Sequence, residues 1–303
     1  MRNIRLSYST LNTFLSCERL FQLDKLLTGA PPRKDYPSTI LGKAFGEGIG
    51  SYLQYQDQDK ALFSLFQSYY PCLEEEGKSL ETCANLLMVA FPALDTLLEE
   101  WELAYFQGKP ALELSFLLNN ISPSPVPDIN CYFVGYVDGV LRNRHTGRYA
   151  ILENKTTGLS LQDLSPIYKN SSQALGYSIV LDRIAGEAHS SYDVIYLIGK
   201  LNPRSLGGFS PELLIHEYPK TLTDRLNWFI TLGMDVERLE RMLSYNMFPM
   251  RGSSCMQYMR PCKHFGTCHL RDLDSYKEEV PDEVEYQFIY DVNELIADHL
   301  ERI

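Results

Sequence analysis

Apolar residues in the N-terminal third of the chain stand three or four positions apart, which is the spacing of amphipathic helices. Segment 7–27 begins with Ser and Thr residues suited to N-caps and predicts a first helix. A loop rich in Pro and charge, at 29–38, separates it from a second helix of roughly 16 residues that begins near Ile40. Two further helices are predicted at about 59–70 and 79–107.

Beyond Ala111 the pattern changes to short apolar runs bounded by Pro, Gly and polar residues, which is typical of strands. The run LELSFLL comes first, and a hairpin follows with strands at 134–141 and 149–155 and a turn at 145–147. The remaining predicted elements are a helix at about 171–185, strands near 192–200 and 213–218, a helix at about 221–245, and an acidic tail at 271–303 that ends in a helix. This order predicts one mixed α/β domain, residues 1–303, with a helical insertion at 57–108.

Three charged residues stand inside the apolar hairpin. Strands with this many Val, Ile, Leu and Tyr residues are usually buried, and charged groups are rarely buried unless they are paired or bind a ligand. Glu153 and Lys155 are two positions apart, so both side chains leave the same face of a strand. If Asp138 lies across from them, two carboxylates and an ammonium meet at one point. Such a group suits a hard cation such as Mg²⁺ or Mn²⁺ together with an anionic substrate.

Composition narrows the setting of such a site. The 303 residues are 45% hydrophobic, and no run approaches the roughly 20 apolar residues of a membrane span. The N-terminus lacks the apolar core of a signal peptide, so a cytoplasmic location without membrane contact is expected. Because the net charge is −11, any surface that binds nucleic acid must be locally basic.

The seven cysteines are odd in number and unevenly placed, which argues against a secreted disulfide framework. A C-terminal trio, Cys255, Cys262 and Cys268, stands beside Pro, Gly and aromatic residues in a segment at 252–270 that suits metal ligation. Buried thiols without a metal are the alternative. The cysteines without ligand spacing are expected in the core: Cys72, Cys83 and Cys131.

The hairpin resembles the catalytic motif of the PD-(D/E)xK nuclease superfamily. That motif is an Asp followed by Glu-x-Lys, and here VGYVDGVL and YAILENK place Asp138, Glu153 and Lys155 at the matching positions. The resemblance implies a restriction-endonuclease-like fold, with a mixed central sheet flanked by helices. It also implies that Asp138 and Glu153 bind Mg²⁺ or Mn²⁺, with the backbone carbonyl of Asn154 as a further ligand. Lys155 would orient a water or stabilise charge in the transition state.

A glutamine and a tyrosine narrow the resemblance to the RecB-like branch of that superfamily. Gln173 and Tyr177 are four residues apart in the helix predicted after the hairpin, so both side chains lie on one helix face. RecB-like nucleases include helicase-associated nucleases, CRISPR-adaptation nucleases and phage exonucleases. They carry a Q-x3-Y helix at this place, and its two side chains contact DNA near the cleavage point. A surface glutamine beside a core tyrosine is the alternative.

The cysteines resemble those of the iron-sulfur type of this branch. Some RecB-like nucleases combine a lone N-terminal cysteine, here Cys17, with a C-terminal trio to hold a 4Fe-4S cluster that ties the chain ends together. Relatives often show C-x2-C-x5-C, whereas the first gap in this trio is six residues. Zinc is therefore the alternative metal, on the same thiolates with His264 or His269.

Two glutamates are candidates for a third ligand of the catalytic metal. Glu113 matches a strand position at which RecB-like relatives often have a glutamate, and an edge residue in solvent is the equal alternative. Those relatives commonly place a metal-binding histidine on the second helix where this chain has Gly46. The adjacent Glu47 could replace it, although a solvated helix residue is favoured there.

The resemblance covers the chain from Ser7 to Cys268 and implies a metal-dependent deoxyribonuclease. We expect hydrolysis of DNA phosphodiesters by an exonuclease in recombination, repair or processing, with a helicase, a recombinase or another DNA-processing protein as partner. The alternative is a non-catalytic DNA-binding or scaffold subunit that keeps the fold. Nothing in the residues indicates strand polarity or oligomeric state.

Overall fold

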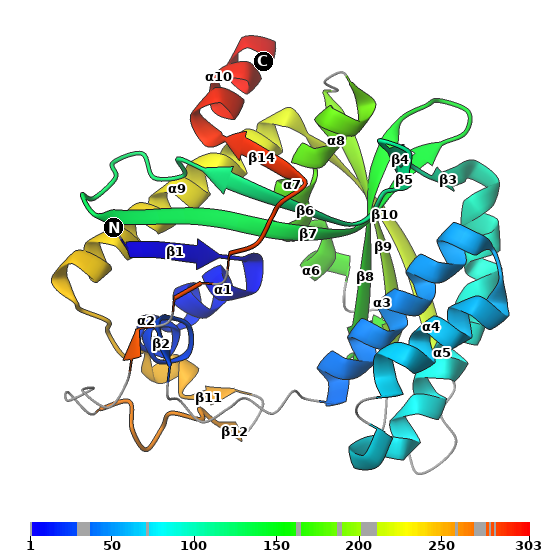
Figure 1. Cartoon of the computed structure of the whole chain (residues 1–303), viewed down its shortest axis with the longest axis horizontal. Coiled ribbons are helices and arrows are strands. Elements are labelled where there is room, and N and C mark those ends of the chain that lie inside the picture. Colours follow the sequence, from blue (N-terminus) through cyan, green and yellow to red (C-terminus); the bar gives the residue numbers. More distant parts are fainter. Residues whose placement is uncertain are drawn as a thin grey trace. The chain divides into compact units, whose positions relative to one another are not determined.

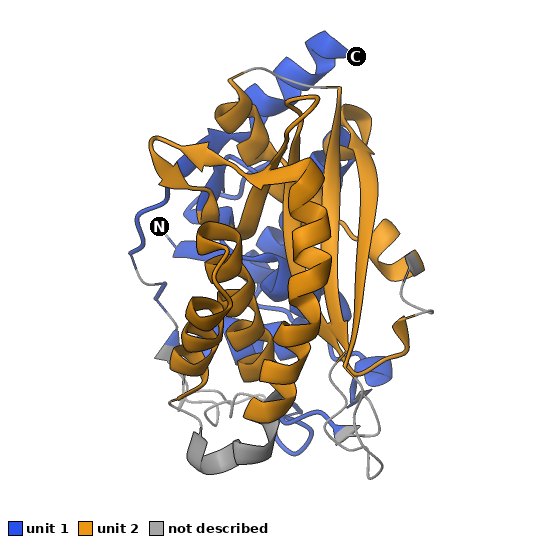
Figure 2. Cartoon of the chain, turned by 90° about the vertical axis from the view of Figure 1, so that its right-hand side faces the viewer, with its two compact units in different colours: residues 1–33, 115–135, 226–303 blue, residues 34–114, 136–225 orange. Residues whose placement is uncertain are grey.

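The computed structural model describes most of the chain. The described residues are 2–28, 37–70, 73–161, 165–186, 190–200, 211–257, 260–269, 277–278, 280–281 and 283–303. They form two compact units (Figure 2). Unit 1 consists of Met1–Arg33, Ser115–Gly135 and Leu226–Ile303, and unit 2 of Lys34–Leu114 and Tyr136–Arg225.

The main sheet is mixed. Its described strands pair in the order β10-β9-β8-β7-β6-β14, and β1 and β3 also pair with β7. Unit 2 holds β3 (Trp101–Leu103), β8 (Tyr149–Thr157), β9 (Ser191–Lys200) and β10 (Glu212–Thr221), whereas β6 (Leu112–Asn119) and β7 (Ile129–Asn143) contribute residues to both units. In unit 2, β7 and β8 are antiparallel, β8 and β9 are parallel, and β9 and β10 are antiparallel. The short hairpin of β4 (Tyr105–Phe106) and β5 (Lys109–Pro110) completes this unit's strands.

Three helices cover one face of the sheet in unit 2 (Figure 1): α3 (Pro37–Tyr55), α4 (Gln58–Tyr69) and α5 (Leu73–Glu100). Their apolar stripes form one buried cluster with sheet residues such as Leu152, Ile195 and Leu197. The packing is close, because a Cβ atom at Gly48 would lie 2.6 Å from Leu87 Cδ2. Alternate residues of the same strands, including Glu153, leave the opposite face.

The connection between the parallel strands β8 and β9 contains α6 (Ser165–Lys169), α7 (Gln173–Tyr177) and α8 (Ile179–Ala185). A parallel pair requires such a crossover, and here it brings α7 and α8 against β8. A fully buried arginine anchors α8. Arg225 donates hydrogen bonds to the hydroxyl and carbonyl oxygens of Ser178 at 2.9 and 2.8 Å and to Asp182 at 2.7 Å, and it stacks over the Tyr192 ring.

Unit 1 contains the two ends of the chain. β1 (Arg2–Leu6) is parallel to β7, and β14 (Phe288–Asp291) is parallel to β6. Its helices are α1 (Tyr8–Ser16), α2 (Glu18–Phe21), the π-helix η1 (Gln22–Leu26), most of α9 (Leu222–Tyr245), the 3-10 helix η4 (Gly252–Ser254) and α10 (Val292–Arg302). Two small antiparallel pairs join β2 (Leu27–Thr28) to β13 (Lys277–Glu278) and β11 (Met256–Gln257) to β12 (Arg260–Pro261). Edge-to-face ring contacts, such as Phe133 with Trp228 at 5.4 Å, fill its core.

The mixed α/β fold, the hairpin and the strands β6, β9 and β10 confirm the sequence prediction. Three predicted helices differ from the structure. The first is interrupted at Cys17, where extended backbone separates α1 from α2. The helix expected to reach residue 107 ends at Glu100, because Trp101–Leu103 pairs with β7. The helix at 171–185 is divided at Ser178. The C-terminal tail ends in a helix, α10, as predicted, and a strand that was not predicted, β14, precedes that helix. The predicted loop at 29–38 lies largely outside the described residues.

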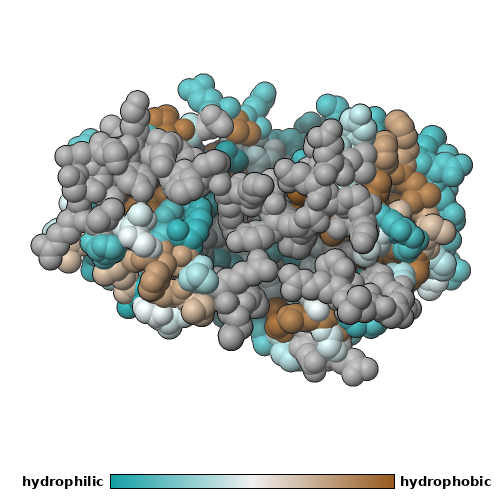
Figure 3. Space-filling view, turned by 90° about the horizontal axis from the view of Figure 1, so that it is seen from below, coloured by the Kyte–Doolittle hydropathy of each residue, from teal (hydrophilic) through white to brown (hydrophobic). Residues whose placement is uncertain are grey.

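One described helix segment, Leu80–Glu100, is long and apolar enough to cross a membrane by length and composition alone. It therefore qualifies the prediction that no such run exists. Leu86, Leu87 and Leu94 from this segment are buried in the cluster of unit 2, as expected for a helix that packs on a sheet. On the face of the molecule drawn in Figure 3, the described apolar residues stand in separate groups among hydrophilic ones.

Candidate active site

Asp138 and Glu153 come together on the hairpin of β7 and β8. The register pairs Gly139 with Leu152, so Asp138 is next across from Glu153. Oδ2 of Asp138 accepts a hydrogen bond from the backbone N–H of Asn154 at 2.7 Å. Glu153 is 1% exposed although it carries a carboxyl group. The hairpin thus holds two carboxyl groups side by side, as its sequence predicts.

Lys155 points to the same carboxyl group. Its Nζ lies 2.5 Å from Oε1 of Glu153, since both side chains leave one face of β8. Gln173, the first residue of α7, donates from Nε2 to that oxygen at 2.8 Å and accepts from Lys155 at 3.0 Å. The Gln173 amide nitrogen is also 3.0 Å from the hydroxyl oxygen of Tyr177, one turn along α7. The four side chains form one connected group in unit 2.

Burial and mutual repulsion change the protonation of this group. Burial first, and the charge of Asp138 second, raise the pKa of Glu153 to about 8. Burial also raises the pKa of Asp138, against the hydrogen bond from Asn154 and the charge of Lys155. Burial alone would lower the pKa of Lys155, but Glu153 and Asp138 together raise it. Glu153 is therefore shifted toward its protonated form near neutral pH.

Two buried oxygen atoms of the hairpin lack hydrogen-bond partners among the described residues. They are Oε2 of Glu153 and Oδ1 of Asn154. An unsatisfied buried carboxylate oxygen is costly, and a divalent cation would coordinate it and relieve the repulsion from Asp138. The residues present therefore fit a hard cation. Within the described ranges, no three Asp, Glu, His or Cys side chains already converge as a complete metal site.

Glu113 belongs to the same electrostatic group. Its side chain is exposed on β6, as the alternative of an edge residue in solvent expects, and its pKa is raised to about 7, first by partial desolvation and then by the charges of Asp138 and Glu47, while the ammonium of Lys43 lowers it. Its φ of 50° lies in the left-handed region, so the backbone departs from strand geometry at this residue of β6. Glu113 also adds to the raised pKa of Glu153. Glu113 is therefore electrostatically coupled to both carboxyl groups of the hairpin, from a position exposed to solvent.

Helix α3 approaches the end of β8 closely. A Cβ atom at Gly42 would lie 3.0 Å from Oγ1 of Thr156. One turn further along, a Cβ atom at Gly46 would meet no atom within 4 Å, so a larger side chain has room there. Glu47 is exposed next to this open position.

The four cysteines predicted to bind metal line one cavity in unit 1, with a volume of about 20 Å³. Cys17 lies at the junction of α1 and α2, and the others come from the C-terminal segment. The pKa of Cys268 is raised, first by burial and then by the thiols of Cys255, Cys262 and Cys17. The structure therefore brings the four predicted thiols to one cavity. Among the described residues, however, no three of these thiols lie at the distances of ligands to a common metal ion.

His264 borders this cavity but bonds to a carboxylate. Its ring is buried, and Nε2 lies 3.2 Å from Oδ1 of Asp24. Lys263 pairs with the same carboxylate; although burial raises the pKa of Asp24, the two basic partners lower it overall. A zinc site that uses His264 could keep this contact, because the other ring nitrogen, Nδ1, is the one that would bind the metal. His269, the other histidine considered, is exposed.

Two of the cysteines expected in the core are described, and both are buried. Burial raises the pKa of Cys83 to about 12, so its thiol is inert at neutral pH. Cys131 is buried on β7, and its pKa is raised by burial and by Glu240. Cys72 lies outside the described residues.

Sequence reasoning missed a buried charge that joins the two ends of unit 1. Glu18 has no exposed surface and accepts hydrogen bonds from Nε and Nη2 of Arg251 at 2.7 and 2.6 Å, and from Arg238. The neighbouring Arg19 donates to the carbonyl oxygen of Cys268 at 3.0 Å. These partners lie more than 200 residues from Glu18 and Arg19, so no local pattern marks them.

Sequence reasoning also missed Tyr168 of α6. Burial raises the pKa of its hydroxyl, and the charges of Lys155 and Glu153 act on it as well. Its ring centroid is 5.0 Å from that of Tyr196. Tyr168 therefore adjoins the candidate site, and only the fold of the crossover reveals this.

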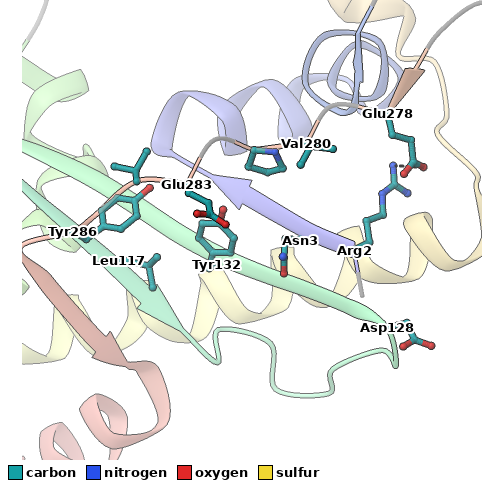
Figure 4. Close-up of a pocket in the computed structure, with 11 residues that line it drawn as sticks. Arg2, Asn3, Leu117, Asp128, Tyr132, Glu278, Val280, Glu283 and Tyr286 are labelled. Atoms are coloured by element: carbon teal, nitrogen blue, oxygen red, sulfur yellow. Dashed lines mark ion pairs between the residues drawn. The ribbon is translucent and has the colours of Figure 1, made fainter.

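A separate cavity of about 730 Å³ lies in unit 1 and contains none of the predicted site residues (Figure 4). Arg2 and Glu278 form an ion pair at 3.1 Å on its wall, and Glu283 and Tyr132 also line it. Asp128 is a further acidic lining residue. Because carboxylates outnumber basic groups in this lining, the cavity does not suit a phosphate.

Some known proteins of solved structure match this chain. No protein with a curated description matches the chain. The crystal structure of a protein named "Putative exonuclease" from Eubacterium rectale is 12% identical, with a TM-score of 0.48, and the match covers 88% of this chain and 94% of that chain. The crystal structure of SSO0001 is 16% identical, with a TM-score of 0.28, and the match covers 76% of this chain and 82% of that chain.

Neither structural likeness is strong enough to decide function. The sequence comparison is decisive about family, because the family model described as the PD-(D/E)XK nuclease superfamily matches residues 5–269. That range includes both strands of the hairpin, all of α7 and the four cysteines. The chain belongs to the PD-(D/E)XK nuclease superfamily.

Proposed function

We propose that the protein is a metal-dependent deoxyribonuclease that hydrolyses phosphodiester bonds in DNA. The observation that carries the proposal is the buried carboxyl group of Glu153, which contacts Lys155 and Gln173 and lies beside Asp138. Burying such a group lowers stability, and clusters of shifted pKa values are typical of functional sites. Membership of a nuclease superfamily supports the same reaction.

Glu153 and Asp138 would hold Mg²⁺ or Mn²⁺, since both are hard carboxylate ligands on adjacent strands. The backbone carbonyl of Asn154 is a further ligand in this proposal, and Glu113 is favoured over Glu47 as the third carboxylate because its charge couples to both Asp138 and Glu153. When bound, the cation polarises the scissile phosphate and lowers the pKa of a coordinated water.

Lys155 would orient the attacking water or stabilise the negative charge that develops on the phosphate. Its ammonium is already fixed by Glu153 and Gln173, so little reorganisation is needed when substrate binds. Gln173 would hold Lys155 in place and, together with Tyr177, position the DNA strand near the cleavage point. The raised pKa of Lys155 keeps the ammonium charged at neutral pH.

A nuclease assay tests this proposal. Purified protein is incubated with Mn²⁺ and either linear or circular DNA, and Glu153→Gln and Lys155→Met are compared with Lys109→Met, a control at an exposed lysine of unit 2. We expect wild type and the control to degrade DNA and the two site variants to lose at least about 100-fold in rate. Degradation of linear DNA alone would identify an exonuclease, which is the activity we propose.

The second candidate is a non-catalytic DNA-binding subunit with the same fold. The observation in its favour is Gly46, which leaves α3 without the histidine of RecB-like relatives. If wild type and the Glu153→Gln variant degrade DNA equally little while both bind it, this second candidate replaces the enzyme. In either case we propose a cytoplasmic protein that works in recombination, repair or DNA processing beside a helicase or recombinase.

We also propose that Cys17, Cys255, Cys262 and Cys268 hold a 4Fe-4S cluster with a structural role, and zinc is the alternative. Their common cavity and the effect of the other three thiols on Cys268 support a shared metal. Anaerobically purified protein should be brown, with stoichiometric iron that is lost in Cys262→Ala and kept in Cys131→Ala. Colourless protein that holds zinc would favour the alternative.

A further inference from the structure

Aromatic rings form a row on the sheet of unit 2. Tyr168 of α6 lies 5.0 Å from Tyr196 of β9, measured between ring centroids. Tyr196 lies 6.0 Å from Tyr218 of β10, and Tyr218 lies 5.6 Å from His216 of the same strand. Successive distances of this size are contacts, so the four rings make a continuous row of aromatic contacts.

The row starts at the candidate active site. Tyr196 is the register partner of Glu153 in the parallel pair of β8 and β9, so the two side chains leave the same face of the sheet side by side. The charges of Lys155 and Glu153 both act on the pKa of the Tyr168 hydroxyl. His216 is the register partner of Tyr196 on β10. The rings therefore extend from the proposed catalytic group across two further strands.

The four rings of the row differ in their exposure to solvent. Tyr196 is fully buried, whereas Tyr168, Tyr218 and His216 are half-buried and present part of each ring to solvent. Alternate residues of the same strands, such as Ile195 and Leu197, face the helices of the core and are aliphatic. In β9 and β10, aromatic side chains thus lie only on the face that carries the catalytic group. Packing alone gives no reason for that choice, because the aliphatic face is packed as well.

We propose that the partly exposed rings of this row, Tyr168, Tyr218 and His216, with the buried ring of Tyr196 between Tyr168 and Tyr218 as their support, are a stacking platform for the bases of single-stranded DNA. Aromatic side chains bind unpaired bases through their faces, and Lys155 supplies the positive charge for the adjoining phosphate. The substrate class is therefore a strand whose terminal bases are unpaired. This inference rests on the proposed nuclease function, whose scissile phosphate would lie at Lys155 and Glu153.

Binding can be measured without cleavage. The probe is a fluorescein-labelled oligothymidine, followed by anisotropy with full-length protein in EDTA. Tyr168→Leu and His216→Leu remove one ring each, Tyr168→Phe keeps the ring without the hydroxyl, and Tyr105→Leu is the control at a tyrosine that is 59% exposed on β4. A second probe carries abasic sites, and a third is a blunt duplex whose bases are paired. Circular dichroism checks that each variant is folded.

We expect Tyr168→Leu and His216→Leu to bind oligothymidine about 5- to 100-fold more weakly, because one stacked base contributes that factor. Tyr168→Phe and Tyr105→Leu should bind like wild type. Wild type should bind the abasic probe as weakly as the leucine variants bind the intact strand. The leucine variants should lose little further affinity when the bases are absent. The proposal would be overturned if wild type and both folded leucine variants bound oligothymidine equally well. It would also be overturned if the leucine variants lost as much affinity for the blunt duplex as for oligothymidine.

The outcome is separable from that of the nuclease assay. Protein that cleaves DNA but binds oligothymidine independently of Tyr168 and His216 would refute the platform and leave the nuclease intact. Protein that does not cleave but loses binding in the leucine variants would support the platform and refute the enzyme.

Discussion

The ammonium of Lys155 lies 2.5 Å from Oε1 of Glu153, two residues earlier on the same face of β8. The contact stabilises the charged form of both groups, but burial and the nearby Asp138 act against the carboxylate and raise the pKa of Glu153. A cation on the free Oε2 atom would reverse that balance, because it favours the ionised carboxylate. A proton and a metal ion therefore compete for the carboxyl group of Glu153.

Without divalent cations, stability should fall as pH rises from about 5 to 8. The pKa of Glu153 is raised from 4.5 to about 8 in the folded protein, so the folded state binds more protons than the unfolded state between these values. Raising the pH through the folded pKa then removes the stability gained from protonation. Thermal unfolding in EDTA should show a falling Tm over this range, by about 2–4 °C for each kcal/mol lost.

The matched variant is Glu153→Gln, which cannot titrate. Its Tm should depend less on pH over the same range, while Glu99→Gln, at an exposed glutamate of α5, should behave like wild type. Mn²⁺ should stabilise wild type more at pH 8 than at pH 5. An unchanged pH slope in Glu153→Gln would show that another group controls the titration.

Gln173→Ala should lower cleavage by about 10- to 100-fold with little loss of stability. Gln173 contacts both Lys155 and Glu153, and such supporting contacts typically have effects of this size. The rate is measured at saturating Mn²⁺, and Gln107→Ala at an exposed turn is the control. A rate equal to that of wild type would mean that Glu153 alone fixes the lysine.

Gly46→His should fit and should tighten Mn²⁺ binding by about tenfold, since imidazole is an additional ligand beside Glu47. Gly46→Ala separates the helix effect, because alanine should raise stability by about 0.5–1 kcal/mol and histidine by less, but only histidine adds a ligand. Gly48→Ala should instead destabilise by about 1–3 kcal/mol, because its Cβ atom would lie 2.6 Å from Leu87. Equal Mn²⁺ affinity in the histidine and alanine variants at Gly46 would place the metal away from α3.

Arg251→Met should destabilise the protein by about 3 kcal/mol in urea unfolding. It removes the two hydrogen bonds by which Arg251 compensates the fully buried Glu18. The double variant Glu18→Met with Arg251→Met should recover part of the loss, because the buried carboxylate is gone and Arg238, which also paired with it, is exposed enough to be solvated. Arg241→Met, which removes an exposed pair with Glu237, should change stability by less than about 1 kcal/mol.

Local sequence patterns were sufficient to predict the helices and strands that have strong periodicity. The hairpin, β9, β10 and α9 follow from apolar spacing and turn residues, and the convergence of Asp138, Glu153 and Lys155 follows from strand alternation. Gln173 and Tyr177 meet this group because helix spacing puts them on one face. The geometry agrees with these expectations, and the catalytic roles of the residues stay predictions.

The features that sequence reasoning missed depend on partners distant in the chain. Arg2–Leu6 becomes a strand because residues 129–133 supply its hydrogen bonds, and Phe288–Asp291 because residues 116–119 do. Trp101 leaves the helix pattern for the same reason. Tyr168 acquires its place from the crossover, and Glu18 from two arginines of the C-terminal part. A single sequence carries no signal for such pairings.

The Glu18 contact has a consequence for synthesis of the protein. Its partner Arg238 is 220 residues later in the chain, so ribosomes that add about 5–20 residues per second need about 10–45 s to deliver it. During that interval Glu18 lacks the basic partners that allow its carboxylate to be buried. Unit 1 can therefore close only near the end of translation, and a truncated nascent chain leaves this acidic side chain in water.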